Sequence, residues 1–397
     1  MAEVKPEIET LAKIKVIGVG GSGSSVVNRM IKKKIRGVEF WAINTDAQAL
    51  HHSASPRKLH IGKTVTRGLG AGMNPELGRR AAEESQNEIR ETLKSSDMVF
   101  ITCGLGGGTG TGASPIIAEI AKDSGALTIA VVTKPFSFEG LQRKEIAEKG
   151  LEELRQKVDS LIIIPNDKIL QIIDKKTSLL DAFAVVDNVL YMGVQGIAEI
   201  ITVPGLINVD FADIKAIMQN TGSALLGIGE ASGENRAEVA AKAAIKSPLL
   251  DISIEGAKGI LFTISGGEDL TMHEVNEAAR IITEQADENA KIIFGAVINE
   301  ELKDQFKVTV VATGFESRPS PSSSLREKET PLYSPYYREN SYLKEKEEEE
   351  TKKKIKIKRE QLFTPTPEEK PTPEESPQKK EEEDELDIPA FIRKKMM

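Results

Sequence analysis

Six of the nine residues from Gly104 to Gly112 are glycine, in the run GLGGGTGTG, which directly follows an apolar stretch of the chain. Glycine in regular structure costs roughly 0.5–1 kcal/mol relative to alanine, and a plain turn needs only one or two glycines. A run this dense favours a backbone that wraps closely around an anion, with the threonine hydroxyls as extra donors. Ser114 and Pro115 then predict the start of the following helix.

A second glycine cluster, GVGGSG at residues 18–23, also lies between an apolar run and a helical pattern. It has the dinucleotide-binding spacing G-x-G-x-x-G, in which glycines allow close backbone approach and a helix N-terminus supplies unpaired N–H donors. A tight turn from strand to helix explains the cluster equally well, so this motif alone does not decide between the two.

Strand and helix patterns alternate along the first part of the chain. Apolar runs predict strands at residues 13–20, 38–44, 98–104, 127–136 and 160–166. Amphipathic stretches predict helices at residues 24–35, at 74–96 with Asn74 as N-cap and Pro75 in the first turn, and from residues 114 and 141. This alternation is typical of an α/β fold with a mostly parallel, Rossmann-like sheet covered on both faces.

A long helix and a smaller α+β domain are predicted to follow. Apolar residues recur at helical spacing from Leu179 to Ile201, over about six turns, which is long enough to connect two domains. Beyond it, the patterns predict strands at residues 259–265, 291–299 and 306–315 and helices at residues 236–244 and 272–288.

The end of the chain has a different composition. Residues 316–397 contain none of the 32 glycines but 10 of the 18 prolines, together with 38 charged residues. Such a segment cannot bury enough apolar surface to offset its chain entropy, so it is predicted to be disordered.

Several classes of protein are disfavoured by composition. The net charge of −8 argues against a protein that wraps nucleic acid, and the single cysteine, Cys103, excludes an internal disulfide and fits a reducing cytoplasm. The apolar runs are too short for a membrane span, and the first residues lack the apolar core of a secretory signal.

The run GGGTGTG at residues 106–112 resembles the signature of the tubulin/FtsZ family of GTPases, especially its bacterial cell-division members. Further segments match in order: NTDAQAL at 44–50, TKPFSFEG at 133–140, ND at 166–167, FAVVDN at 183–188, GLINVDFAD at 205–213 and LDIPAFIR at 386–393. The resemblance implies an N-terminal extension (1–13), a GTP-binding domain (14–178), a connecting helix (179–202), a C-terminal GTPase-activating and polymerisation domain (203–315), a disordered linker (316–384) and a partner-binding peptide (385–397).

The resemblance also implies a set of nucleotide-binding residues. Asn166 and Asp187 match positions that bond the guanine edge, and Phe183 matches one that stacks on the base, although an aromatic residue on a helix also fits core packing. Glu139 and Arg143 match positions near the ribose and base, although their i,i+4 spacing also fits an ordinary surface ion pair. The other matching positions are Gly20, Gly21, Ser22, Gly23, Ser24, Ser25, Asn44, Gly104, Gly107, Gly108, Thr109, Gly110, Thr133 and Pro135. Ser22, Ser24 and Ser25 stand where many members have glycines and an asparagine, which leaves the nucleotide affinity open.

The expected catalytic residues are Asp210 and Asp213, supported by Asn208. In the family this segment is the synergy loop, which enters the active site of the next subunit, where the aspartates polarise or position the attacking water. The same spacing also predicts a capping box for a helix at residues 211–218, and both interpretations can hold together. Mg²⁺ is expected on phosphate oxygens and waters, because no dense carboxylate cluster predicts a protein metal site.

The implied partners are further copies of the chain, in head-to-tail filaments that scaffold a division ring. The resemblance places them in the cytoplasm at the division site, under the inner membrane, with division proteins and membrane tethers bound to residues 385–397. No transmembrane segment and no specific nucleic acid are expected.

Two alternatives come from the same patterns. An NAD(P)- or FAD-dependent oxidoreductase fits residues 18–23, but it needs an acidic residue at the end of the second strand, where Asp46 is only a loose candidate, and it leaves residues 104–112 unexplained. A structural protein that binds nucleotide but barely hydrolyses it is disfavoured by the presence of Asp210 and Asp213.

Overall fold

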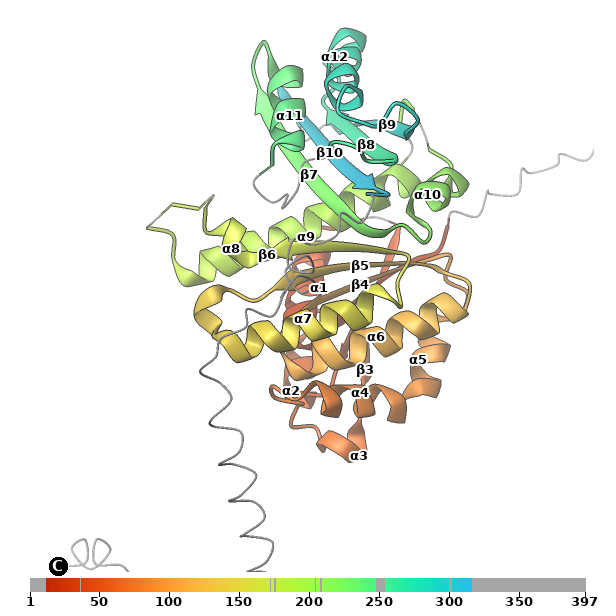
Figure 1. Cartoon of the computed structure of the whole chain (residues 1–397), viewed down its shortest axis with the longest axis vertical. Helices are drawn as coiled ribbons and strands as arrows, with labels where there is room; N and C mark the ends of the chain where they lie inside the picture. Colours follow the sequence, from red (N-terminus) through yellow and green to blue (C-terminus); the bar gives the residue numbers. More distant parts are fainter. Residues whose placement is uncertain are drawn as a thin grey trace, which may run out of the picture. The chain divides into compact units, whose positions relative to one another are not determined.

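A ten-stranded mixed sheet forms the centre of the computed structural model (Figure 1), with the strand order β3-β2-β1-β4-β5-β6-β7-β10-β8-β9. The strands are β1 (Ile14–Val19), β2 (Val38–Asn44), β3 (Arg57–His60), β4 (Met98–Gly104), β5 (Leu127–Lys134), β6 (Ser160–Pro165), β7 (Gly222–Ser232), β8 (Gly259–Gly266), β9 (Lys291–Ile298) and β10 (Gln305–Thr313). The first six are parallel in the order 3-2-1-4-5-6, which is the Rossmann order, so the prediction of a Rossmann-like sheet is confirmed.

The structure describes residues 12–35, 37–171, 173–174, 176–203, 205–207, 209–247, 254–299 and 302–315. The chain divides into two units, Met1–Arg318 and Pro319–Met397, and all described residues belong to the first. The predicted linker (316–384), the terminal peptide (385–397), Asn208 and nearly all of the N-terminal extension lie outside the described residues.

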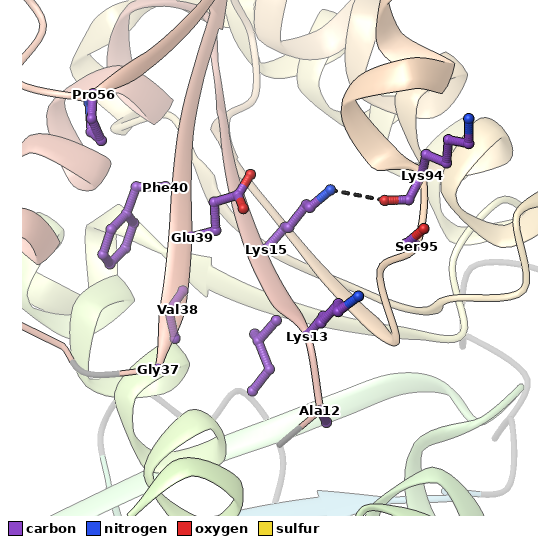
Figure 2. Close-up of a pocket in the computed structure, with 11 residues that line it drawn as sticks. Ala12, Lys13, Lys15, Gly37, Val38, Glu39, Phe40, Pro56, Lys94 and Ser95 are labelled. Atoms are coloured by element: carbon purple, nitrogen blue, oxygen red, sulfur yellow. Dashed lines mark hydrogen bonds between the residues drawn. The ribbon is translucent and has the colours of Figure 1, made fainter. Parts of the chain in front are cut away.

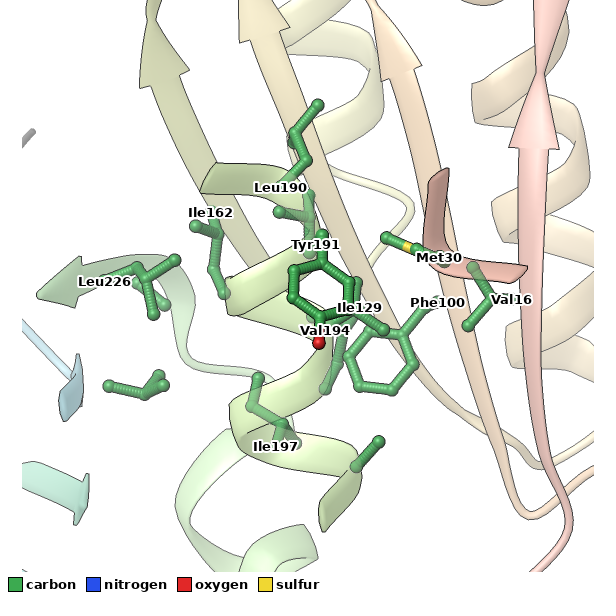
Figure 3. Close-up of a cluster of buried hydrophobic side chains, with 14 of the residues drawn as sticks. Val16, Met30, Phe100, Ile129, Ile162, Leu190, Tyr191, Val194, Ile197 and Leu226 are labelled. Atoms are coloured by element: carbon green, nitrogen blue, oxygen red, sulfur yellow. The ribbon is translucent and has the colours of Figure 1, made fainter. Parts of the chain in front are cut away.

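Helices cover both faces of the parallel strands, because alternate strand residues point to opposite sides. On one face, Val16 and Phe100 join the cluster under α1 (Gly20–Lys32) and α9 (Leu179–Thr202), as Figure 3 shows in part. On the other face, Ile17 and Ile101 pack under four helices: α4 (Pro75–Glu84), α5 (Gln86–Leu93), α6 (Gly108–Asp123) and α7 (Leu141–Arg155). The shorter helices are α2 (Ala47–His52), α3 (Lys63–Thr66), a 3₁₀ turn (Ser137–Glu139), α8 (Asn166–Ile169) and α10 (Phe211–Met218).

Helix α9 confirms the predicted long helix and contacts both the parallel strands and the C-terminal strands (Figure 1). Residues Leu180–Thr202 are long and apolar enough to cross a membrane by length and composition alone, which the sequence had not led us to expect. However, Leu190, Val194 and Ile197 lie in the buried cluster of Figure 3. The helix is therefore a core element of this fold.

The C-terminal strands β7, β8 and β10 pack against α11 (Arg236–Ile245) and α12 (Met272–Thr283) through a separate apolar cluster, and β9 pairs with β8 at the edge of the sheet. Strand β7 was not predicted, because it is rich in glycine and small residues. A Cβ on Gly227 or Gly229 would lie 2.1 or 1.9 Å from a carbonyl oxygen of α11, so these glycines allow the close packing of that helix.

The predicted helix at residues 74–96 is in fact two helices. Asn74 caps α4 by accepting from the Leu77 N–H, as expected, but α4 ends before Ser85. The Ser85 hydroxyl instead accepts the Gly62 N–H at 3.1 Å, so a tertiary contact lies at the break.

The predicted start of α6 at Ser114 is wrong, since the helix begins at Gly108 and Pro115 lies within it. The glycines of its first turns permit close backbone packing: a Cβ on Gly108 would lie 2.6 Å from the Gly72 carbonyl oxygen, and one on Gly112 would lie 1.9 Å from that of Pro75. Part of the glycine run is therefore explained by helix packing.

Candidate functional site

A cavity of about 360 Å³ lies at the carboxyl ends of β1, β4, β5 and β6. Ligands of open α/β sheets bind at this edge, in the crevice beyond the strand ends. The lining includes these predicted residues: Gly20, Gly21, Ser22, Gly104, Gly107, Gly108, Thr109, Gly110, Thr133, Pro135, Glu139, Arg143, Asn166, Phe183 and Asp187. The fold thus brings together residues that are up to 167 positions apart in the chain.

Two helix N-termini contribute to the cavity, those of α1 and α6. Both start within glycine clusters, and neither N-cap residue, Val19 nor Gly107, bonds the first turn through its side chain. The Gly108 N–H is taken by the Gly72 carbonyl, but other N–H groups of a first helical turn have no partner within the helix. Cβ atoms on Gly21 and Gly107 would meet no heavy atom within 4 Å, so both glycines border open space. This arrangement suits a phosphate chain.

The serines of the first cluster bond the protein itself. Ser22 Oγ accepts the Gly104 N–H at 2.8 Å and so connects the two glycine clusters. Ser24 Oγ donates to the Gly20 carbonyl, and Ser25 Oγ donates to the Gly21 carbonyl. In this structure these two hydroxyl protons are therefore directed at the backbone of α1.

Gly23, Ser24, Ser25 and Asn44 are not among the residues that line the cavity, contrary to our expectation. A Cβ on Gly23 would lie 2.4 Å from the Thr102 carbonyl oxygen, so this glycine allows α1 to pack on β4. Asn44 Oδ1 accepts the N–H groups of Thr45 and Asp46 and shapes the turn after β2. The hydroxyl of Thr45, in that turn, lies 2.6 Å from that of Thr109 in the cavity wall.

The other end of the cavity carries an aromatic ring and hydrogen-bond acceptors. Phe183 is 43% exposed, and its ring meets that of Phe136 edge to face at 5.6 Å. Among the described residues, Asn166 Oδ1 is buried without a hydrogen-bond partner. Asp187 lies one helical turn after Phe183 on α9 and lines the same cavity.

The environment of Asp187 changes its acidity. Burial raises the pKa of its carboxyl group to about 6, and the positive charge of Arg29 partly opposes this shift. Arg29 Nε on α1 lies 3.7 Å from Asp187 Oδ2. Asp187 is consequently a carboxylate near neutral pH but takes up a proton in mild acid.

Glu139 and Arg143 form the ion pair that their spacing allowed, and both side chains border the cavity. Glu139 Oε1 also accepts the Phe136 N–H at 2.9 Å, which fixes the 3₁₀ turn. The surface-pair and ligand-site interpretations of these two residues are therefore compatible.

Five lining residues were not anticipated: Val26, Gly72, Leu105, Val186 and Leu190. Gly72 ends the glycine-rich segment GLGAG at residues 68–72, in which all three glycines have positive φ. The high density of glycine in this segment could have identified Gly72 as a lining residue from the sequence. The four apolar residues were not separable from core residues by sequence pattern.

Asp210 and Asp213 are exposed at the N-terminus of α10 and do not line the cavity. Asp210 caps the helix by accepting the Ala212 N–H at 3.3 Å. Within the described part of the chain, no hydrogen bond returns from the Asp213 carboxylate, so the predicted capping box is only half formed.

A second cavity, of about 760 Å³, lies at the amino ends of β1 and β2, where Lys15, Glu39 and Lys94 border it (Figure 2). The Lys15 ammonium group donates to the Thr92 and Lys94 carbonyls. None of its residues was predicted to bind a ligand. In the ranges that the structure describes, no group of three or more His, Cys, Asp or Glu side chains could hold a metal ion.

Fold and cavity together define a nucleotide-binding protein of the tubulin-like class. Residues 13–174 match the GTPase domain of the Tubulin/FtsZ family, and residues 222–316 match the C-terminal domain of the FtsZ family. An empty FtsZ dimer from M. jannaschii shares 50% identity and a TM-score of 0.76, over 78% of this chain and 90% of that one. The chain belongs to the FtsZ family.

Two further structures are similar. A point mutant of M. jannaschii FtsZ has 51% identity and a TM-score of 0.75, over 78% of this chain and 93% of its own. The GTPγS-bound protofilament of CetZ2 from Haloferax volcanii has a TM-score of 0.66 at 22% identity. The match covers 78% of this chain and 96% of the CetZ2 chain, and it shows that the two proteins share a fold. The matched GTPase domain makes this chain a GTPase, so the oxidoreductase alternative is wrong.

Proposed function

We propose that this chain binds GTP with Mg²⁺ in the cavity and hydrolyses it within head-to-tail filaments. These filaments form the scaffold of a cell-division ring, in the cytoplasm at the division site under the membrane. The proposal is supported by membership of the FtsZ family and by the dimer and protofilament of its relatives.

Guanine is the base that the cavity suits best. Asn166 Oδ1, a buried acceptor without a partner, and the Asp187 carboxylate border the same cavity as Phe183. Two acceptors match the N1–H and N2–H₂ donors of guanine, whereas adenine has no such pair and would leave a buried acceptor unpaired. This pair of acceptors is the observation that carries the proposal.

The predicted lining residues, with Gly72 added, are proposed to hold the rest of the nucleotide. The glycine-rich turns and the N-termini of α1 and α6 would bind the phosphates, and Glu139 and Arg143 would contact the ribose. Mg²⁺ would rest on phosphate oxygens and water, since the described residues offer no cage of ligands. When bound, it neutralises charge on the phosphates.

Hydrolysis is proposed to be completed in trans. The carboxylates of Asp210 and Asp213 are exposed and lie outside the lining of their own cavity, so they are available to the nucleotide of a neighbouring subunit. There they would position the attacking water, with Asn208 in support. The cap formed by Asp210 stiffens the start of α10 and presents both carboxylates from a rigid element.

The remaining parts of the proposal concern the chain's organisation. Residues 14–178 would bind GTP, and residues 203–315 would complete the neighbour's active site. Residues 179–202 would connect these two domains. Residues 316–384 would act as a linker, and residues 385–397 would bind division proteins and membrane tethers.

GTP hydrolysis per subunit, measured with Mg²⁺ against protein concentration and alongside light scattering, tests the mechanism. Activity should rise only above a threshold concentration at which scattering also begins. The Asp210→Asn variant keeps a good N-cap residue, so it should fold and assemble but hydrolyse GTP at least tenfold more slowly, at about the scale of a lost catalytic contact. Asp287→Ala, which removes another carboxylate that bonds a backbone N–H, is the matched control.

Two results would contradict this mechanism. Activity per subunit that stays constant on dilution would mean that one chain holds a complete site. Normal hydrolysis by assembled Asp210→Asn would remove the assigned role of that residue.

A further inference from the structure

Helix α10, which carries Asp210 and Asp213 at its N-terminus, is anchored at both ends by elements distant in sequence. Before the helix, the chain pairs with the edge strand β9: the Leu206 N–H donates to the Ala296 carbonyl at 2.9 Å, and the Ala296 N–H donates to the Ile207 carbonyl at 3.2 Å. The approach to the helix is therefore set by the C-terminal strands.

The C-terminal carbonyls of α10 are bonded by buried hydroxyl groups. Ser160 Oγ donates to the Met218 carbonyl at 2.6 Å, and Thr313 Oγ1 donates to the Ile217 carbonyl at 3.0 Å. Thr221 Oγ1 lies 3.2 Å from the Met218 carbonyl and 2.7 Å from Ser160 Oγ. The last carbonyls of a helix have no partner within it, so these bonds decide where the helix end lies.

Asp159 holds the turn that follows α10. Its carboxylate accepts the Asn220 N–H at 3.3 Å and the Thr128 N–H at 2.9 Å, and it pairs with Lys122 Nζ at 3.2 Å. Its own carbonyl accepts the N–H groups of Thr221 and Gly222. Asp159 and Ser160 are 3% and 0% exposed, so both act from inside the protein.

These residues cannot touch the nucleotide of their own subunit. Ser160 is the first residue of β6, and Asn166, in the cavity wall, follows the last. Six strand residues span roughly 20 Å, at about 3.3 Å per residue. One rigid strand thus connects the base-binding end of the cavity with the anchor of α10.

We propose that Ser160 and Thr221 are positioning residues for hydrolysis in trans: beside the turn that Asp159 holds, their hydroxyl groups fix the end of α10, so that the two aspartates at its start meet the neighbour's nucleotide in one geometry. This inference rests on the proposed function of the two aspartates. A displacement of about 1 Å at a catalytic group can lower a rate roughly 100-fold, so a loosened helix end should reduce turnover without removing any group from the active site.

The test compares Ser160→Ala, Thr221→Val and the double variant with the unaltered full-length chain. At saturating GTP, above the assembly threshold, kcat per assembled subunit should fall at least tenfold in the double variant. KM, GTP affinity in dilute protein and the assembly threshold should stay within about twofold. Thr221→Ser keeps the hydroxyl and should restore kcat when compared with Thr221→Val.

Ser124→Ala is the matched control, because Ser124 Oγ donates to the Ile120 carbonyl near the C-terminus of another helix, α6. It should leave kcat unchanged. An unchanged kcat in the Ser160→Ala/Thr221→Val variant would overturn the inference. So would a fall in kcat that only follows loss of polymer or of bound GTP, since that indicates a structural role.

Asp210→Asn is run in the same assay to separate the two proposals. If it hydrolyses normally, the proposed function fails and the positioning role fails with it. If Asp210→Asn is slow while the double variant is normal, hydrolysis in trans stands and only the positioning role is refuted.

Discussion

The raised pKa of Asp187 makes GTP affinity sensitive to mild acid. Protonation of this carboxyl group weakens it as an acceptor for the guanine donors, and burial raises its pKa to about 6. Lowering the pH from about 7.5 to about 5.5 takes the ionised fraction from nearly all to roughly a quarter, so the Kd for GTP should rise about fourfold from this group alone.

Substitution isolates that contribution. Asp187→Asn removes a charged hydrogen-bond acceptor worth about 1.5–3 kcal/mol, so the Kd at neutral pH should rise roughly 10–100-fold. The part of the pH dependence that belongs to Asp187 should disappear with it. Arg29→Met removes the charge that opposes the shift, so the midpoint should move to higher pH.

The assay is equilibrium binding of GTP to dilute, unassembled protein over this pH range. The terminal phosphate also takes up a proton there, so the Asp187→Asn profile is subtracted from that of the unaltered chain. Asp181→Asn is the control, because Asp181 lies on the same helix but does not line the cavity. Identical pH profiles for the unaltered chain and Asp187→Asn would refute an ionised Asp187 at the base.

Three further predictions follow from packing and burial. Gly112→Ala should destabilise the fold by about 1–3 kcal/mol in chemical denaturation, because its Cβ would lie 1.9 Å from a backbone carbonyl oxygen of α4. A Cβ at Gly107 would meet no atom, so Gly107→Ala should alter only GTP binding. Arg236, which is 6% exposed, and to a lesser degree the hydrogen bonds from Thr271 lower the pKa of Glu274 to about 2. Ionised Glu274 should therefore stabilise the fold above about pH 4.5 and lose about 2 kcal/mol as the pH falls from there toward 2, and Arg236→Met should reduce this dependence in acid titrations of stability. Burial raises the pKa of the Cys103 thiol to about 11, so native protein should resist iodoacetamide at about pH 8 and react only after denaturation.

Each of these has a contrary result. Equal stability of the two glycine variants would mean that the packing of α4 on α6 is not tight. An unchanged acid profile in Arg236→Met would show that the ion pair does not couple to folding. Rapid labelling of native Cys103 would mean that the region around the glycine run opens.

Patterns along the chain located the parallel sheet because buried strands and amphipathic helices have different apolar periods. The run from Leu179 to Ile201 was long and regular enough to predict α9 nearly to its ends. Strand β7 was not predicted because Gly227 and Gly229 weaken the strand pattern. These glycines allow α11 to pack closely on the strand, and that contact with a distant segment leaves no mark in the local sequence pattern.

The candidate site was also predicted only in part from the sequence. Glycine density located the part of the cavity lining at the starts of α1 and α6, since close backbone approach to an anion requires glycine. The lining residues at the base and ribose end were predicted from the family resemblance. Ser114 and Pro115 placed the start of α6 six residues too late, because the glycines before them already belong to the helix. Gly108 and Gly112 allow the helix to contact the backbone of Gly72 and of α4 closely.

By itself, the sequence determined which residues have the chemistry to bind a nucleotide and where most of the parallel strands and the long helix α9 lie, because both depend on residue type and local spacing. Tertiary structure alone decided that Ser24 and Ser25 turn to their own helix, that Asp187 is buried beside Arg29, and that Ser160 meets the end of α10. These outcomes depend on the direction and burial of side chains from distant segments, and such distances exist only once the chain is folded.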